Sequence, residues 1–227
     1  MHRLLTPLAL VLTVALAGSG CADYHVKNLA KSDVDLVADE FIAECRTLVL
    51  ELMIKLYKRN PDQLRKISGL TIEGRMAQLR VHRNELLFDE LDRKQGIDAM
   101  NLAFDPAFRG DRVFALTVGL GGMLRQAYGY KPELFIFDQL NGSALRTSAR
   151  NVEILAWKLR DSRTPEGDYF LISHEYRGVV DNLSFERLFG KLIALQDMMA
   201  RIAGDAGDRA MTSAVHTVGR AFIPLPL

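Results

Sequence analysis

Residues 113–124 read VFALTVGLGGML and form the most apolar stretch of the chain after its first 20 residues. The stretch carries no charged side chain, and its 12 residues are too few to cross a bilayer, which takes about 20 residues of helix. A helix that is apolar on every side is buried inside a folded domain. We therefore predict a core helix here, with the remaining helices packed around it.

Three glycines interrupt this apolar stretch, at Gly119, Gly121 and Gly122. Each glycine destabilises a helix by about 0.8–1 kcal/mol relative to alanine. A cost of this size favours positions where a neighbouring helix approaches the backbone closely. The functional alternative is a ligand pressed against the bare backbone, in which case helix 113–124 lines a pocket for an apolar molecule.

Apolar residues recur every three or four positions on both sides of this stretch, which is the spacing of a buried helix face. Ser32 is a candidate N-cap for the first long helix, and Asn60-Pro61 ends it. The predicted helices are 33–59, 61–67, 71–94, 113–124, 143–160, 184–203 and 205–219, with 97–111 as a linking stretch. The predicted fold class is mainly α, a single helical-bundle-like domain over residues 32–227 with room for one short β-hairpin.

Periodicity does not decide between helix and strand at 133–138, 152–160 and 168–175. A hairpin that pairs 152–159 with 169–172 is the rival to a helix over 143–160. The C-terminal tail, FIPLPL at 222–227, is extended and apolar. It either lies over the domain's own core or docks on an envelope protein partner.

Composition excludes some functions. The first 20 residues contain Arg3 and no acid, so the rest of the chain carries 28 basic and 28 acidic side chains. This neutral balance gives no electrostatic reason to expect nucleic acid as a partner. Cys45 lies on the apolar stripe of the first helix, which favours a buried thiol over a reactive one.

No catalytic motif stands out, and the sequence predicts no metal site and no cofactor. His82 and Glu85 are three residues apart in a predicted helix, with Asp89 one turn further on, but this pattern lacks a second histidine. His174 precedes Glu175 at a possible strand end. An envelope hydrolase that uses His82 or His174 with nearby acids is therefore the weakest of three functional hypotheses.

The chain begins MHRLLTPLALVLTVALAGSGC, with a positive start, an apolar centre and small residues before Cys21. This is the layout of a secretory signal, and its ending resembles the lipobox of bacterial lipoproteins. The resemblance implies cleavage after residue 20, a diacylglyceryl group on the Cys21 thiol and a lipidated tether over 21–31. An ordinary secretory signal and a buried apolar helix are the alternatives.

The resemblance also implies a location in the cell envelope. Ala22 follows Cys21, and in enteric lipoproteins the absence of aspartate at that position favours the outer membrane, with the inner membrane still open. The whole chain is similar to proteobacterial envelope lipoproteins that have no assigned activity. The leading hypothesis is a lipid-anchored, non-enzymatic assembly or adaptor protein on the periplasmic face of the outer membrane. A carrier or sensor of an apolar ligand is the second hypothesis.

Overall fold

The structure is a computed structural model that describes residues 31–81, 85–135, 138–176, 179–180, 182–204 and 222–226. The described part of the chain is mainly helical, so the predicted fold class is confirmed. Its elements are α2 (Asp33–Arg59), α3 (Pro61–Arg65), α4 (Ile72–Val81), the 3₁₀ turn η2 (Asp89–Leu91), α5 (Gly96–Leu102), α6 (Arg112–Ala127), α7 (Gly142–Asp161), β1 (Glu175–Tyr176), β2 (Val179–Val180) and α8 (Ser184–Ile202).

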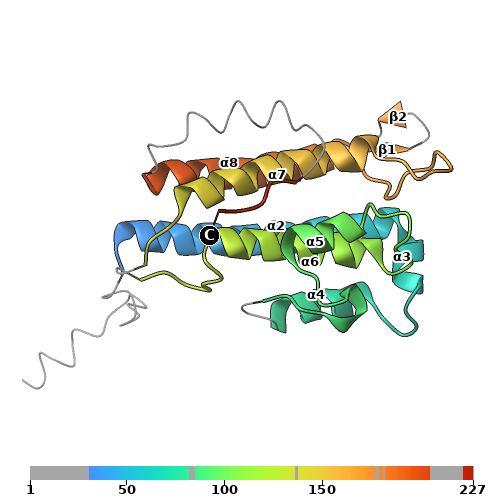
Figure 1. The fold of residues 1–227 in the computed structure, drawn as a ribbon, viewed down its shortest axis with the longest axis horizontal. Helices are drawn as coiled ribbons and strands as arrows, with labels where there is room; N and C mark the ends of the chain where they lie inside the picture. Colours follow the sequence, from blue (N-terminus) through green and yellow to red (C-terminus); the bar gives the residue numbers. More distant parts are fainter. Residues whose placement is uncertain are drawn as a thin grey trace, which may run out of the picture.

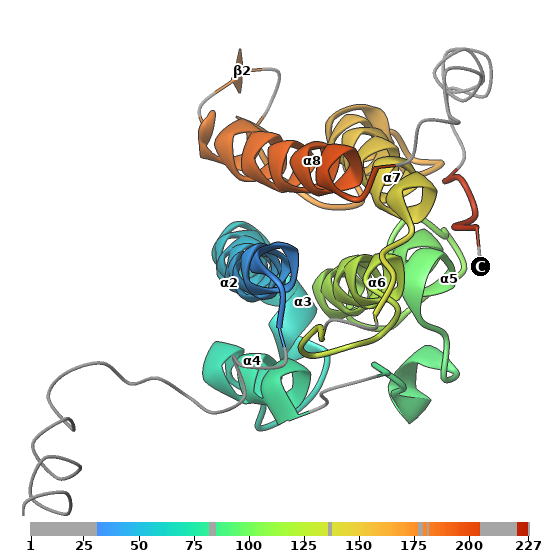
Figure 2. The same cartoon turned by 90° about the vertical axis from the view of Figure 1, so that its left-hand side faces the viewer.

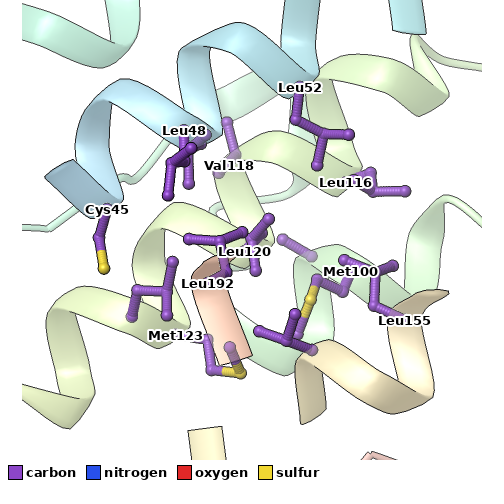
Figure 3. Close-up of a cluster of buried hydrophobic side chains, with 14 of the residues drawn as sticks. Cys45, Leu48, Leu52, Met100, Leu116, Val118, Leu120, Met123, Leu155 and Leu192 are labelled. Carbon is purple, nitrogen blue, oxygen red and sulfur yellow. The ribbon is translucent and has the colours of Figure 1, made fainter. Parts of the chain in front are cut away.

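The helices form two layers. In Figures 1 and 2, α7 and α8 lie side by side and antiparallel over α2 and α6, α5 flanks α6, and α4 lies on the opposite side from α7 and α8. The predicted core helix is confirmed as α6, in which Phe114, Leu116, Val118 and Leu120 are fully buried. Figure 3 shows side chains of α2, α5, α6, α7 and α8 meeting around it.

The first long helix was predicted correctly at both ends. Ser32 accepts a hydrogen bond from the backbone of Asp35, and the Asp35 side chain accepts one from the backbone of Ser32, which is a capping box. At the other end, the backbone N–H of Asn60 donates to the Leu56 carbonyl oxygen before Pro61 opens α3. Because both ends are set by local chemistry, the sequence alone could place them.

The predicted helix over 71–94 is wrong from Glu85 onward. After α4, residues 85–88 are irregular and η2 ends with Asp92 and Arg93 at positive φ. The carboxylate of Glu90 accepts two hydrogen bonds from Arg75, at 2.5 and 2.8 Å. A buried arginine needs an anion, and this pairing outweighs the continuous helix that the local pattern favours.

The linking stretch predicted at 97–111 is also wrong in its first part, because α5 occupies it. Gly96 is the first residue of α5. Ala99, Met100 and Leu102 bury their side chains in the core, and α5 packs closely on α6. Tertiary burial of a short apolar face therefore stabilises a helix that is too short to be stable alone.

The three ambiguous stretches have three outcomes. Residues 152–160 belong to α7, so the hairpin with 169–172 is wrong, and the small antiparallel hairpin joins β1 to β2 instead. Only Glu175 of the stretch 168–175 belongs to a strand, although Arg163 and Tyr169 form an isolated bridge. The described residues of 133–138 are neither helix nor strand, since Asp39 and Asp138 accept the backbone N–H groups of Leu134 and Phe135.

The described part of the tail, residues 222–226, lies against α7 with Phe222 and Leu225 buried in the core cluster. Asn151 of α7 donates to the Ile223 carbonyl oxygen and accepts from the Ile223 N–H, both at 2.7 Å. The tail therefore lies over the domain's own core. The predicted helix 205–219, the signal 1–20 and the tether 21–30 lie outside the described residues.

Candidate functional site

A cavity of about 450 Å³ lies between α2, α4 and α6, and the loop 131–133 borders it. Each helix contributes one face, so the cavity is held by regular elements rather than by a single loop. Its lining residues are Ile42, Cys45, Arg46, Val49, Leu50, Leu79, Arg80, Leu86, Gly121, Leu124, Arg125, Tyr128, Lys131, Pro132 and Glu133. No transmembrane-length apolar helix occurs in the part of the chain that the structure describes.

The three glycines of α6 have two different roles: two admit a neighbouring helix, and one lines the cavity. A Cβ on Gly119 would lie 2.6 Å from the carbonyl oxygen of Gly96, and one on Gly122 would lie 3.0 Å from the Gly96 nitrogen. These two glycines therefore admit α5 at close range, as predicted for a neighbouring helix. Gly121 faces the other way and lines the cavity, where its Cβ would meet the side chains of Leu86 and Val49.

Cys45 lines the cavity, and its sulfur has a hydrogen-bond partner inside the protein. Gln196 of α8 donates to the sulfur of Cys45 at 3.1 Å, and its carbonyl oxygen accepts from Ser148 at 2.9 Å. Burial raises the pKa of the Cys45 thiol to about 12 and also raises the pKa of Tyr128. Cys45 is therefore a neutral thiol at physiological pH, which confirms the buried role and removes a nucleophile from this wall.

The rim of the cavity is basic. Arg46, Arg80, Arg125 and Lys131 line it, against a single lining carboxylate, Glu133. Arg125 donates to the Leu79 carbonyl oxygen at the end of α4, at 3.1 Å. Burial, with the nearby charge of Arg46 as a smaller cause, lowers the pKa of Arg125 to about 10, so its guanidinium still carries its charge at neutral pH.

Two of the rim side chains already have oppositely charged partners. Lys131 forms an ion pair with Asp138, and Glu133 pairs with Lys31 at 3.3 Å. Arg46 and Arg125 are half-buried, and each donates to a backbone carbonyl, that of Pro132 at 3.5 Å in the case of Arg46. These two guanidinium groups combine positive charge with contact to the apolar wall.

A second polar cluster is buried elsewhere, under α4. Arg75 is fully buried, and one of its terminal nitrogens lies 3.2 Å from Asp111, which also accepts a 2.6 Å hydrogen bond from the hydroxyl of Tyr57. Asp111 caps α6 by accepting from the N–H of Phe114. None of these residues lines the cavity, and their contacts tie α2, α4 and α6 together, so we assign this cluster a structural role.

His174 is the histidine that the described ranges contain, and it does not line the cavity. His174 is buried, its Nδ1 lies 3.2 Å from Ser173 Oγ, and no acidic side chain is among the hydrogen-bond partners that the structure gives it. His82 and Cys21 lie outside the described residues. Within the described ranges, no group of three or more histidine, cysteine, aspartate or glutamate side chains has the arrangement of a metal site.

The chain was compared with family models, curated proteins and solved structures, and none of them matches it. Gly121 was predicted from the sequence as a possible ligand contact, but the basic rim was not. Arg46, Arg80 and Arg125 lie on three separate helices, so no local spacing brings them together. The one available signal was that Arg46 and Arg125 each directly follow a residue of an apolar stripe, Cys45 and Leu124.

Proposed function

We propose that this protein is a lipid-anchored envelope protein whose helical domain binds an apolar ligand, as a carrier or sensor. The observation that carries the proposal is the cavity between α2, α4 and α6. Its volume of about 450 Å³ falls within the range of roughly 300–1,000 Å³ that is usual for small-molecule sites. Its lining provides an aliphatic wall of the kind that small-molecule sites use, beside several charged side chains.

The anchor rests on the N-terminal sequence. Each buried methylene contributes about 0.8 kcal/mol, so two or three acyl chains on Cys21 would hold the domain at a membrane where one chain would not. Globomycin treatment should block processing, and Cys21→Ala should abolish palmitate labelling and release the protein from the membrane fraction. Labelling that persists in Cys21→Ala would refute the anchor.

Two experiments test the cavity: one looks for a bound molecule, and the other reduces the space for it. Native mass spectrometry of the full chain, extracted from envelopes, should show a bound apolar molecule. Gly121→Leu should reduce its occupancy, since the new side chain projects toward Leu86 and Val49. Gly190→Leu is the matched control, because Gly190 is exposed on α8 and a Cβ there meets nothing within 4 Å. Wild-type protein without any bound molecule would count against the proposal.

One separate observation favours the assembly or adaptor role. Val34, Leu36 and Val37 are each 37–42% exposed in the first turns of α2, where the tether joins the domain. Exposed apolar side chains grouped in this way can mark a docking surface. A photo-crosslinker at Val37 should then capture a discrete envelope protein in whole cells, whereas one at the exposed Gln139 should not. Equal capture from both positions would remove this support.

A further inference from the structure

The cavity has two chemically different parts, and this difference limits what it can hold. Val49, Leu79, Leu86 and Leu124 give it an aliphatic wall, while four cationic side chains stand at its rim. A wholly apolar molecule would place hydrocarbon directly against these charged side chains. A small inorganic anion would leave the aliphatic wall in contact with water. Neither ligand matches both parts.

Arg46 and Arg125 are the side chains that a ligand headgroup would meet. Both line the cavity and both are half-buried, and the charge of Arg46 adds to burial in lowering the pKa of Arg125. Like charges near each other in a partly desolvated site are unfavourable, and an anion between them removes the repulsion. Guanidinium groups present their N–H donors in a planar fork that suits carboxylate and phosphate oxygens.

The uncharged polar groups at and behind the cavity wall do not compete for the headgroup. The Gln196 amide bridges Ser148 and Cys45, and the Cys45 thiol is neutral. These groups already have hydrogen-bond partners inside the protein and carry no charge, so they offer no site to an anion. A ligand with one charged end would therefore place that end at the rim and its chain inside.

We propose that the cavity binds a single-chain amphiphile with an oxyanion head, a carboxylate or a phosphate, which lies between Arg46 and Arg125 while the acyl chain contacts the aliphatic wall. This inference rests on the proposed ligand-binding function and specifies its ligand class. It assigns the two arginines as specificity-determining residues. It also assigns Gly121, with the neighbouring Leu86 and Val49, to the wall that the chain contacts.

The test compares three probes of equal chain length on the purified full chain: dodecanoic acid, dodecyl phosphate and dodecanol. Each competes with a photoreactive dodecanoic acid, and the labelled peptides are mapped. We expect labelling within residues 42–50 and 121–128, and stronger competition by the two anionic probes than by dodecanol, by about tenfold or more. Arg125→Gln should weaken the anionic probes and leave dodecanol unchanged.

Controls separate this inference from the function on which it rests. Arg187→Gln removes an exposed cation of α8 and should change nothing. Arg46→Gln provides a second variant if Arg125→Gln unfolds, since Arg125 also caps α4. Absence of cavity labelling by any probe would overturn the ligand-binding function itself. Two results would overturn only the amphiphile inference. One is competition by dodecanol as strong as that by the acid, and the other is displacement of the probe by inorganic phosphate on its own.

Discussion

Gly119 of α6 lies directly against Gly96, the first residue of α5, so that a Cβ on Gly119 would lie 2.6 Å from the Gly96 carbonyl oxygen. Gly96 itself has a φ of +54°, a conformation that side chains with a Cβ rarely adopt. The two glycines together allow α5 and α6 to meet backbone to backbone. This close contact explains why glycine stands at position 119 of an otherwise strongly apolar helix.

Alanine at Gly119 should destabilise the domain, because the added methyl group has no space and both backbones must move. We expect a loss of roughly 1–3 kcal/mol in the free energy of unfolding. Gly190→Ala should instead raise it by about 0.5–1 kcal/mol, since that glycine is inside α8 with open space around it. Denaturant unfolding of both variants measures the difference, and equal effects would contradict the close contact.

Removal of Arg75 should be more damaging than removal of an exposed arginine. Arg75→Met leaves Asp111, whose side chain is 1% exposed, without its cation, and we expect a loss of about 3–5 kcal/mol. Arg65→Met breaks the pair with Asp62, in which both side chains are at least 70% exposed, and should cost at most about 1 kcal/mol. Similar losses in the two variants would argue against a structural role for the buried cluster.

The buried thiol makes stability depend on pH in alkali. Folding raises the pKa of Cys45 from 9.0 to about 12, because burial disfavours the thiolate. The contribution of the Cys45 thiol to the free energy of unfolding is fully present below pH 9. It is lost as the pH rises toward 12, by up to about 4 kcal/mol. Cys45→Ala should therefore show a shallower fall in unfolding free energy over this range.

Tyr57 and Tyr128 add to the same fall above pH 10, since burial raises both of their pKa values, and they are present in the variant as well. The difference between wild type and Cys45→Ala is therefore the quantity that reports on Cys45. In the native protein at pH 8, the thiol should resist iodoacetamide and react only after unfolding. Rapid alkylation of folded protein would show that the thiol is accessible.

Asn151 should control whether the tail stays on the domain. Asn151→Ala removes both hydrogen bonds to Ile223, and we expect faster trimming by carboxypeptidase while α7 and α8 remain folded by circular dichroism. Asn101→Ala changes an exposed asparagine of α5 and serves as the control. A tail trimmed at the same rate in both variants would mean that Phe222 and Leu225 hold it without Asn151.

Local chemistry determined much of the helical layout. Ser32 and Pro61 set the bounds of α2, and the apolar run at 113–124 identified the core helix, because capping and burial patterns act over a few residues. Local patterns failed to predict the backbone conformation where it depends on a residue far away in the sequence. Asp39 supplies the hydrogen bond that makes Leu134 part of a loop, and it stands 95 positions away in the sequence.

The sequence by itself determined a mainly helical domain, the buried state of Cys45 and the close approach at Gly119 and Gly122, since each follows from residue type and helical period. Only the tertiary structure decided that Glu90 partners Arg75, that α5 forms, and that Arg46, Arg80 and Arg125 face one cavity. The physical reason is that charge pairing and cavity shape depend on how separate helices pack together. No single segment contains that information.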